Sequence, residues 1–491
     1  MPEGLCPRVT PSPARPAVST ARPAAALVLT LVLGCSLAPK YERPAPPVAD
    51  RYPAAEQAKP AAVPVADLGW REVLGDARLQ ALVALALKNN RDLRVAALNV
   101  DLARARYRIE RSALLPTVAA SGSFNRARTP LDESPISQPF TQSYWTVGVG
   151  LSAWELDFFG RLRSLKEEAL QTFFATEEAH RSARLSLVAA VAEADLALVA
   201  VDEELALTRR TAELVETSYA LIRRRYEAGQ ASELDLRTAE GQVQTARVDL
   251  AAFTRQRALL EDALVLLVGQ PLPPDLPPAA GLDETDVMSD LPPGLPSELL
   301  VRRPDILSAE HTLEAANASI GAARAAFFPS ITLTAFGGFS SSDLTHLFDG
   351  PSGMWNFTPQ VNLPIFTGGR NSANLEAAKI GQEIGLAQYE KAIQVAFREV
   401  ADALASRAQL DAQTEAEKSL VAAEERRYQL SDLRYKKGID SYLVVLTAQQ
   451  DLYSSQRLLI QVRLARLTNL VELYRALGGG WYEHTSEALG Q

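Results

Sequence analysis

The sequence predicts a helix-dominated fold in which two internal repeats each supply two β-strands, a very long helix and a shorter return helix. Residues 160–229 contain no proline and no internal glycine, and their apolar residues recur three and four apart, as in a helix. Residues 369–438 match that stretch in length, in the Gly-Arg at the start and in the end, RRYEAG against LRYKKG. Period-two alternation precedes both stretches, so the chain is an internal duplication of strands and long helices.

Length, composition and charge narrow the function. At 491 residues the chain is expected to form more than one compact unit. It is acidic, with a formal net charge of -9, and it contains no basic run. Nucleic acid is therefore not an expected partner.

The N-terminus has the pattern of an export signal. Three arginines precede the apolar run 24–33, which at about ten residues is too short to span a bilayer. These arginines are Arg8, Arg15 and Arg22. The residues around Cys35 resemble a bacterial lipoprotein box, which implies removal of residues 1–34, acylation of Cys35 with palmitate among the acyl groups, and sorting to the outer membrane because Ser36 follows. An ordinary cleaved signal peptide with an incidental cysteine is the alternative.

The first repeat is expected over residues 70–270. In chain order we expect an extended, proline-rich strap (35–69), helices at 77–89 and from 90 to about 115, strands at about 117–129 and 143–156, the long helix 161–228 and the return helix 232–268. Asp76 is expected to cap the first helix, and either Asn90 or Asp92 the second. Ser232, with Asp235 three residues later, has the spacing of a capping box at the start of the return helix.

The second repeat is expected over residues 297–481, between a proline-rich linker (271–296) and a short C-terminal tail (482–491). Its elements are helices over 297–328, strands at about 330–341 and 355–366, the long helix 370–437 and the return helix 441–477.

The predicted strands are apolar on one face. That face is expected to hold Trp145, Val147, Val149, Leu151 and Ala153 in one strand and Trp355, Phe357, Val361 and Leu363 in another. Membrane-spanning strands and a soluble sheet with one solvated face both produce this alternation, so the alternation does not distinguish between the two interpretations. An open sheet edge is not stable in lipid, so membrane insertion of only four strands would require several copies to share one barrel.

Five blocks of sequence in a fixed order resemble one known family. They are GCSLAPKYERPAPPVA (34–49), NNRDLRVAALNVDLARARYRIERSALLP (89–116), WELDFFGRLRSLKEEA (154–169), LVRRPDILSAEHTLEAANASIGAARAAFFPSITL (300–333) and YRALGGGW (474–481). The chain is similar to the TolC-type outer-membrane efflux factors, and within them to the OprM-like, NodT-family lipoproteins. The resemblance covers nearly everything after Cys35.

The resemblance implies a homotrimer with a shared barrel of 12 strands in the outer membrane and a coiled-coil helical tunnel through the periplasm. It also implies passive export of small molecules, a periplasmic membrane-fusion adaptor, and an inner-membrane pump of the resistance-nodulation-division (RND) class. A lipid-tethered periplasmic coiled-coil adaptor or scaffold is the alternative function, and the two strand pairs argue against it.

The same resemblance places the turns at Gly229 and Gly438 at the periplasmic tip, where this family has its gate. It implies gate roles for Asp235, Tyr435 and Leu443. Thr447 stands where the OprM-like pattern has Asp, so a ring of three Asp235 carboxylates would be the main charged constraint and would favour cations. The alternative for Asp235 is a helix N-terminal charge that the helix dipole stabilises.

The sequence gives no support for an enzyme, a metal site or a cofactor. The histidines are scattered, without a pair four residues apart, and no nucleophile-elbow, dinucleotide-binding or phosphate-loop motif occurs. Carboxylates on the long helices alternate with Arg and Lys, which is typical of solvated or interhelical faces.

Overall fold

The computed structural model describes residues 36–49, 51–52, 63–135, 138–289, 291–292, 294 and 296–489. The predicted signal segment and Cys35 lie outside the described residues. The chain divides into two compact units, which are described separately below. The first comprises Met1–Lys40, Ile109–Glu167 and Asn317–Ala378, and the second Tyr41–Arg108, Glu168–Ala316 and Lys379–Gln491.

The helices of the first half are α2 (Trp70–Val73), α3 (Ala77–Asn89), α4 (Arg91–Ser112), α5 (Arg161–Glu227) and α6 (Glu233–Val268), with a short 3-10 turn, η1 (Val65–Asp67), before them. Side-chain caps begin α3, α4 and α6. Asp76 Oδ1 accepts the N–H groups of Arg78 and Leu79, both at 2.9 Å, which confirms this cap. Asn90 rather than Asp92 caps α4, because its Oδ1 accepts the N–H of Leu93 at 2.8 Å.

The second half has a helix break that the sequence analysis missed. Its helices are α7 (Pro296–Arg302), α8 (Pro304–Ala325), α9 (Arg370–Lys436), α10 (Tyr442–Ala476) and α11 (Thr485–Leu489). The helical stretch predicted over 297–328 is therefore interrupted at Arg303, and its last helix ends at Ala325. Pro304 has no N–H and disfavours the helical conformation at Arg303, so α7 ends there and α8 begins at the proline.

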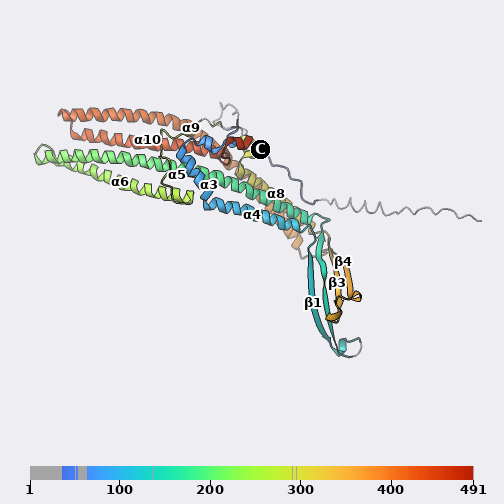
Figure 1. Cartoon of the computed structure of the whole chain (residues 1–491). Helices are drawn as coiled ribbons and strands as arrows, with labels where there is room; N and C mark the ends of the chain where they lie inside the picture. Colours follow the sequence, from blue (N-terminus) through green and yellow to red (C-terminus); the bar gives the residue numbers. More distant parts are fainter. Residues whose placement is uncertain are drawn as a thin grey trace, which may run out of the picture. The chain divides into compact units, whose positions relative to one another are not determined.

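The first unit contains a four-stranded antiparallel sheet in the order β1-β2-β3-β4 (Figure 1). The strands are β1 (Val118–Thr129), β2 (Phe140–Leu156), β3 (Ser330–Ser341) and β4 (Gly353–Asn362), with short 3-10 turns at η2 (Leu131–Glu133), η3 (Leu344–His346) and η4 (Gly350–Ser352). β4 stops before its predicted end at 366, so Leu363 lies outside the strand and is not part of its apolar face. Pro364, directly after Leu363, cannot donate to a ladder, which accounts for the early end.

The predicted alternation of β2 fails at one residue. Ala153 has φ 50°, and the register against β3 shifts between Leu151 and Trp154. This bulge removes Ala153 from the apolar face and returns Trp154 to it, opposite Leu333. The register gives one continuous apolar face, which holds Phe124 and Val118 of β1, Trp145, Val147, Val149, Leu151 and Trp154 of β2, Leu333, Ala335 and Phe339 of β3, and Trp355, Phe357 and Val361 of β4.

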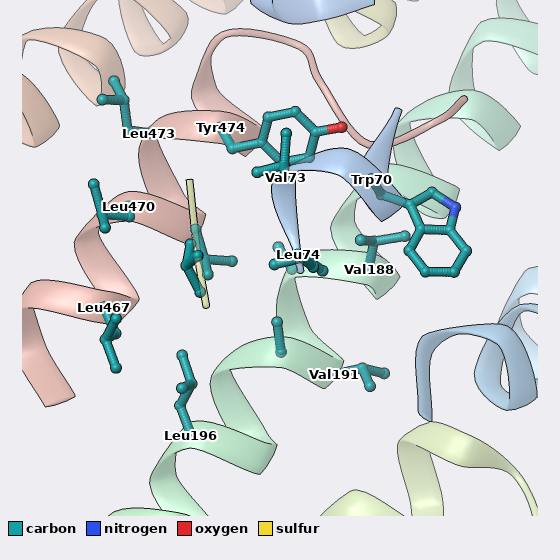
Figure 2. Close-up of a cluster of buried hydrophobic side chains, with 14 of the residues drawn as sticks. Trp70, Val73, Leu74, Val188, Val191, Leu196, Leu467, Leu470, Leu473 and Tyr474 are labelled. Atoms are coloured by element: carbon teal, nitrogen blue, oxygen red, sulfur yellow. The ribbon is translucent and has the colours of Figure 1, made fainter. Parts of the chain in front are cut away.

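The second unit has its main core where α2 packs against α5 and α10 (Figure 2). Trp70 and Val73 of α2 are fully buried, in one cluster with Val191 of α5 and Leu473 of α10. Tyr474 donates its hydroxyl to the carbonyl of Leu68 at 2.6 Å. This core holds one end of each of two helical hairpins. The first hairpin is formed by α5 and α6, and the second by α9 and α10.

Candidate functional site: the turns of the two helical hairpins

The two hairpin turns share one backbone design. Gly229 has φ 72° and Gly438 has φ 73°, and nothing lies within 4 Å of a Cβ built on either glycine. At each turn the glycine N–H bonds to the carbonyl three residues back, and the next N–H bonds to the carbonyl five residues back. This is the Schellman motif, and it requires the left-handed conformation that glycine adopts without strain.

Tyr435 joins the two repeats. The guanidinium of Arg225, on α5, donates from Nη1 to the Tyr435 hydroxyl on α9, and its carbon lies 5.4 Å from the centre of that ring. The Tyr435 ring also lies 5.3 Å from the ring of Tyr442, on α10, at a tilt of 54°. The hydroxyl and the ring of one side chain thus contact two other helices.

A small apolar cluster lies beneath these contacts. Its buried members come from three helices, α5, α6 and α10: Ile222, Ala239, Tyr442, Val445 and Leu446. Tyr428 and Tyr435 of α9 pack against it while partly buried. Burial raises the pKa values of Tyr428 and Tyr442 above their usual range, so both rings carry neutral hydroxyls at ordinary pH.

Asp235 has a local structural partner. Its Oδ2 accepts the Ser232 backbone N–H at 3.2 Å and the Ser232 hydroxyl at 2.7 Å, while its own N–H bonds back to the Ser232 Oγ at 3.1 Å. This is a capping box at the first turn of α6, and it confirms the predicted cap. Among the described residues, no hydrogen bond joins Asp235 to Tyr435.

Leu443 and Thr447 lie one helical turn apart on α10. The Thr447 hydroxyl donates to the Leu443 carbonyl at 3.0 Å, so it is occupied within its own helix. The Leu443 side chain is 56% exposed, and that of Leu234, at the matching place in the first repeat, is 73% exposed. Two apolar side chains at equivalent places near the turns thus face away from the core of the chain.

The structure adds a charged pair that the sequence analysis missed. Arg434 holds Asp440 through two hydrogen bonds, from Nε at 2.6 Å and Nη2 at 3.1 Å. These bonds hold the pKa of the Asp440 carboxyl below its usual value. The repeat gives no signal for this pair, because Arg434 corresponds to Arg225 but the place of Asp440 is Ala231 in the first repeat.

Within the described residues, no group of three His, Cys, Asp or Glu side chains is placed to hold a metal ion. A search of the same residues finds no helix with the length and apolar character needed to cross a membrane.

Comparison with known proteins identifies a family over most of the chain. The family described as "Outer membrane efflux protein" matches residues 82–270 and 295–479. The chain is 48% identical over 458 residues to the "Probable efflux pump outer membrane protein TtgC" of Pseudomonas putida, covering 93% of this chain and 94% of that one. It is 45% identical over 463 residues to the "Outer membrane protein OprJ" of Pseudomonas aeruginosa, covering 94% and 96%.

The fold is also similar to a solved channel. The open state of the MtrE outer membrane channel of Neisseria gonorrhoeae superimposes with a TM-score of 0.83 at 40% identity, covering 92% of this chain and 100% of that one.

Proposed function

Because this chain belongs to the outer membrane efflux protein family, we propose that it works as a passive, gated duct formed by three copies. The chain is an outer-membrane component of efflux, and small molecules leave through it. We assign no catalytic step to it. The energy for export would come from a partner pump.

The sheet carries this proposal. Its two outer strands, β1 and β4, each have one side unpaired among the residues that the structure describes, and one face of all four strands is largely apolar. In lipid every backbone polar group needs an internal partner, so the free edges must pair with other copies. Three copies would supply 12 strands, within the range of single membrane barrels.

The helices supply the path below the membrane. In this proposal residues 70–270 and 297–481 are two repeats, with the proline-rich linker 271–296 between them, and each contributes one helical hairpin to a tunnel wall. α5 and α9 each have 67 residues, about 100 Å of helix, which is longer than a compact domain requires. A periplasmic membrane-fusion adaptor and an RND-class inner-membrane pump are the expected partners at the turns.

The gate would lie at the hairpin turns. Arg225 and Tyr435 would hold the two repeats together in the closed state, and three copies of Leu443 would narrow the opening. Asp235 would add a ring of carboxylates while keeping its capping role. With Thr447 in place of a second carboxylate, this would be the main charged ring and would favour cations.

The same proposal includes a lipid anchor at Cys35, after removal of residues 1–34. The strap that follows, 35–69, would connect the anchor to the folded units.

Size-exclusion light scattering of detergent-extracted protein, with and without heating, tests the duct. A species of three chains from the membrane fraction, which dissociates on heating, is expected. A monomer that leaves the membrane when Cys35 is changed to Ala would exclude the duct and favour a tethered scaffold.

A further inference from the structure

The apolar face of the sheet ends in two arginines. On β1, Arg126 and Arg128 follow Phe124 at steps of two residues, and they therefore lie on the same face. Both side chains are exposed. The only other charged residue in the four strands is Glu155, which lies on the polar face opposite Thr332.

Their place along the strand is defined by an aromatic pair. The rings of Phe124 and Trp145 are 4.3 Å apart, opposite each other at the loop end of the apolar face. Trp154 lies on the same face near the other end. The path from Trp145 to Trp154 is about 30 Å, and a strand tilt of 35–45° reduces it to roughly 21–25 Å along the membrane normal. That height is close to the apolar band of membrane strands, and Trp145 lies at the end of the band nearest the connection between β1 and β2.

Arg126 and Arg128 lie just outside this band, about 7 Å and about 14 Å along the strand from Phe124. They lie toward the connection between β1 and β2, which is the outer side of the membrane in the proposed duct. Their partners across the ladder are Ser143 and Thr141, whose hydroxyls can donate hydrogen bonds. Among the described residues neither guanidinium has a hydrogen-bond or ion-pair partner.

We propose that Arg126 and Arg128 bind the phosphate groups of a lipid headgroup in the outer leaflet, with Ser143 and Thr141 as additional donors. Guanidinium groups match phosphate oxygens with two parallel hydrogen bonds each, and their aliphatic stems can lie along the apolar face. A cation at this depth gains from an anionic headgroup, whereas at the middle of the bilayer it would be costly. The inference rests on the proposed function, because it requires the sheet to span the membrane.

Binding of a phosphorylated lipid to the full-length protein tests this site. Detergent-purified protein is titrated with bis-phosphorylated lipid A or with phosphatidylcholine, and retained lipid is measured by native mass spectrometry. Wild-type protein should retain more lipid A than phosphatidylcholine. The variant R126Q/R128Q should bind lipid A roughly ten- to thirtyfold more weakly. The variant R126K/R128K keeps the positive charges but loses the planar guanidinium groups that form two parallel bonds. Its affinity for lipid A should therefore lie between those of wild type and R126Q/R128Q.

The control variant is R209Q/R255Q, which removes the same charge from exposed positions on α5 and α6. It should bind lipid A as wild type does. Inorganic phosphate at millimolar concentration should compete weakly; full displacement would indicate a free-anion site and overturn the lipid assignment. Equal lipid A retention by R126Q/R128Q and wild type would also overturn it.

The oligomer is measured in parallel by its resistance to dissociation on heating. If R126Q/R128Q lowers that resistance equally with and without lipid A, the arginines are contacts between copies and the proposal fails. If wild type forms no oligomer, the duct itself fails, which separates the two proposals.

Discussion

Arg225 on α5 donates a hydrogen bond to the hydroxyl of Tyr435 on α9, and this bond joins the two repeats next to their turns. The repeats are not equivalent in this respect. Arg434, which matches Arg225 in the duplication, bonds Asp440 in its own turn instead. Next to the turns, Arg225 therefore links the two hairpins, whereas Arg434 makes a link within its own hairpin.

Removing the Arg225–Tyr435 link should open the proposed gate. We expect R225Q and Y435F each to raise single-channel conductance in planar bilayers several-fold, because each removes one side of the same charge-assisted bond, of order 1–3 kcal/mol. Y435F keeps the ring that packs on Tyr442. The double variant should conduct no more than the stronger single variant, since the two residues act through one bond.

Tyr226 provides the matched control for this experiment. It occupies the place of Tyr435 in the first repeat and is 39% exposed. Y226F should conduct as wild type does. Additive effects of R225Q and Y435F would show that the bond does not hold the gate.

The turn of the second hairpin should loosen only in strong acid. Arg434 lowers the pKa of Asp440 below the usual 3.8, so the contribution of this carboxylate to stability is fully present above 3.8. It is lost as the pH falls through the lower folded-state value. Amide protection of the peptide around residues 434–441, measured by hydrogen exchange and corrected for intrinsic rates, should be constant from about pH 7 to pH 5 and fall below 3.8.

The D440N variant tests the cause of that pH dependence. It should show reduced protection of the same peptide at neutral pH and little further change in acid. Protection equal to wild type at neutral pH would mean that the Arg434 pair contributes nothing to the turn.

Alanine at the turn glycine should destabilise the hairpin end for a conformational reason alone. There is open space around Gly438, but its φ of 73° strains any Cβ, so G438A should cost roughly 1 kcal/mol of local opening free energy. The measurement is hydrogen exchange of the amides of residues 434–441. Gly241 is the control, because it is helical within α6 and also has open space around it. G241A should be neutral or stabilising by about 0.5–1 kcal/mol. A loss of amide protection in both variants would point to a role of the glycines other than backbone conformation.

Much of this fold follows from local sequence signals, and the failures have physical causes. The long helices lack breakers and the caps at Asp76 and Ser232 have the expected spacing, so these elements could be predicted from local sequence. The break before Pro304 has a local signal that was missed. The bulge at Ala153 has no such signal, since it depends on how β2 meets β3. Likewise the Arg225–Tyr435 bond joins residues 210 apart in sequence, and only the packing of α5 against α9 brings them together.

The attachment of the strap near residue 43 should depend on one buried carboxylate, that of Glu310. Arg43 donates to Glu310 from Nε at 2.6 Å and Nη2 at 2.8 Å, and the Tyr41 hydroxyl lies 3.1 Å from the same group. The Glu310 side chain is 5% exposed, so R43Q would leave a buried charge without its cation. Because the Arg43 side chain is itself 45% exposed, we expect a loss of about 1–3 kcal/mol rather than the full cost of breaking a buried pair. Limited proteolysis should then cleave the strap near residue 43 faster than in wild type.

A variant of a nearby tyrosine distinguishes the effect of the ion pair on strap cleavage from the effect of packing at this position. Tyr389 is 1% exposed, and among the described residues its hydroxyl has no hydrogen-bond partner. Y389F should leave strap cleavage unchanged or slow it, because it removes an unsatisfied buried hydroxyl and keeps the ring. E310Q removes the buried charge together with the attraction for Arg43, so it should release the strap with a smaller loss of stability than R43Q. Equal cleavage rates in wild type, R43Q and E310Q would show that the strap is held by its other contacts, such as the stacking of Tyr52 on Phe397 at 5.0 Å.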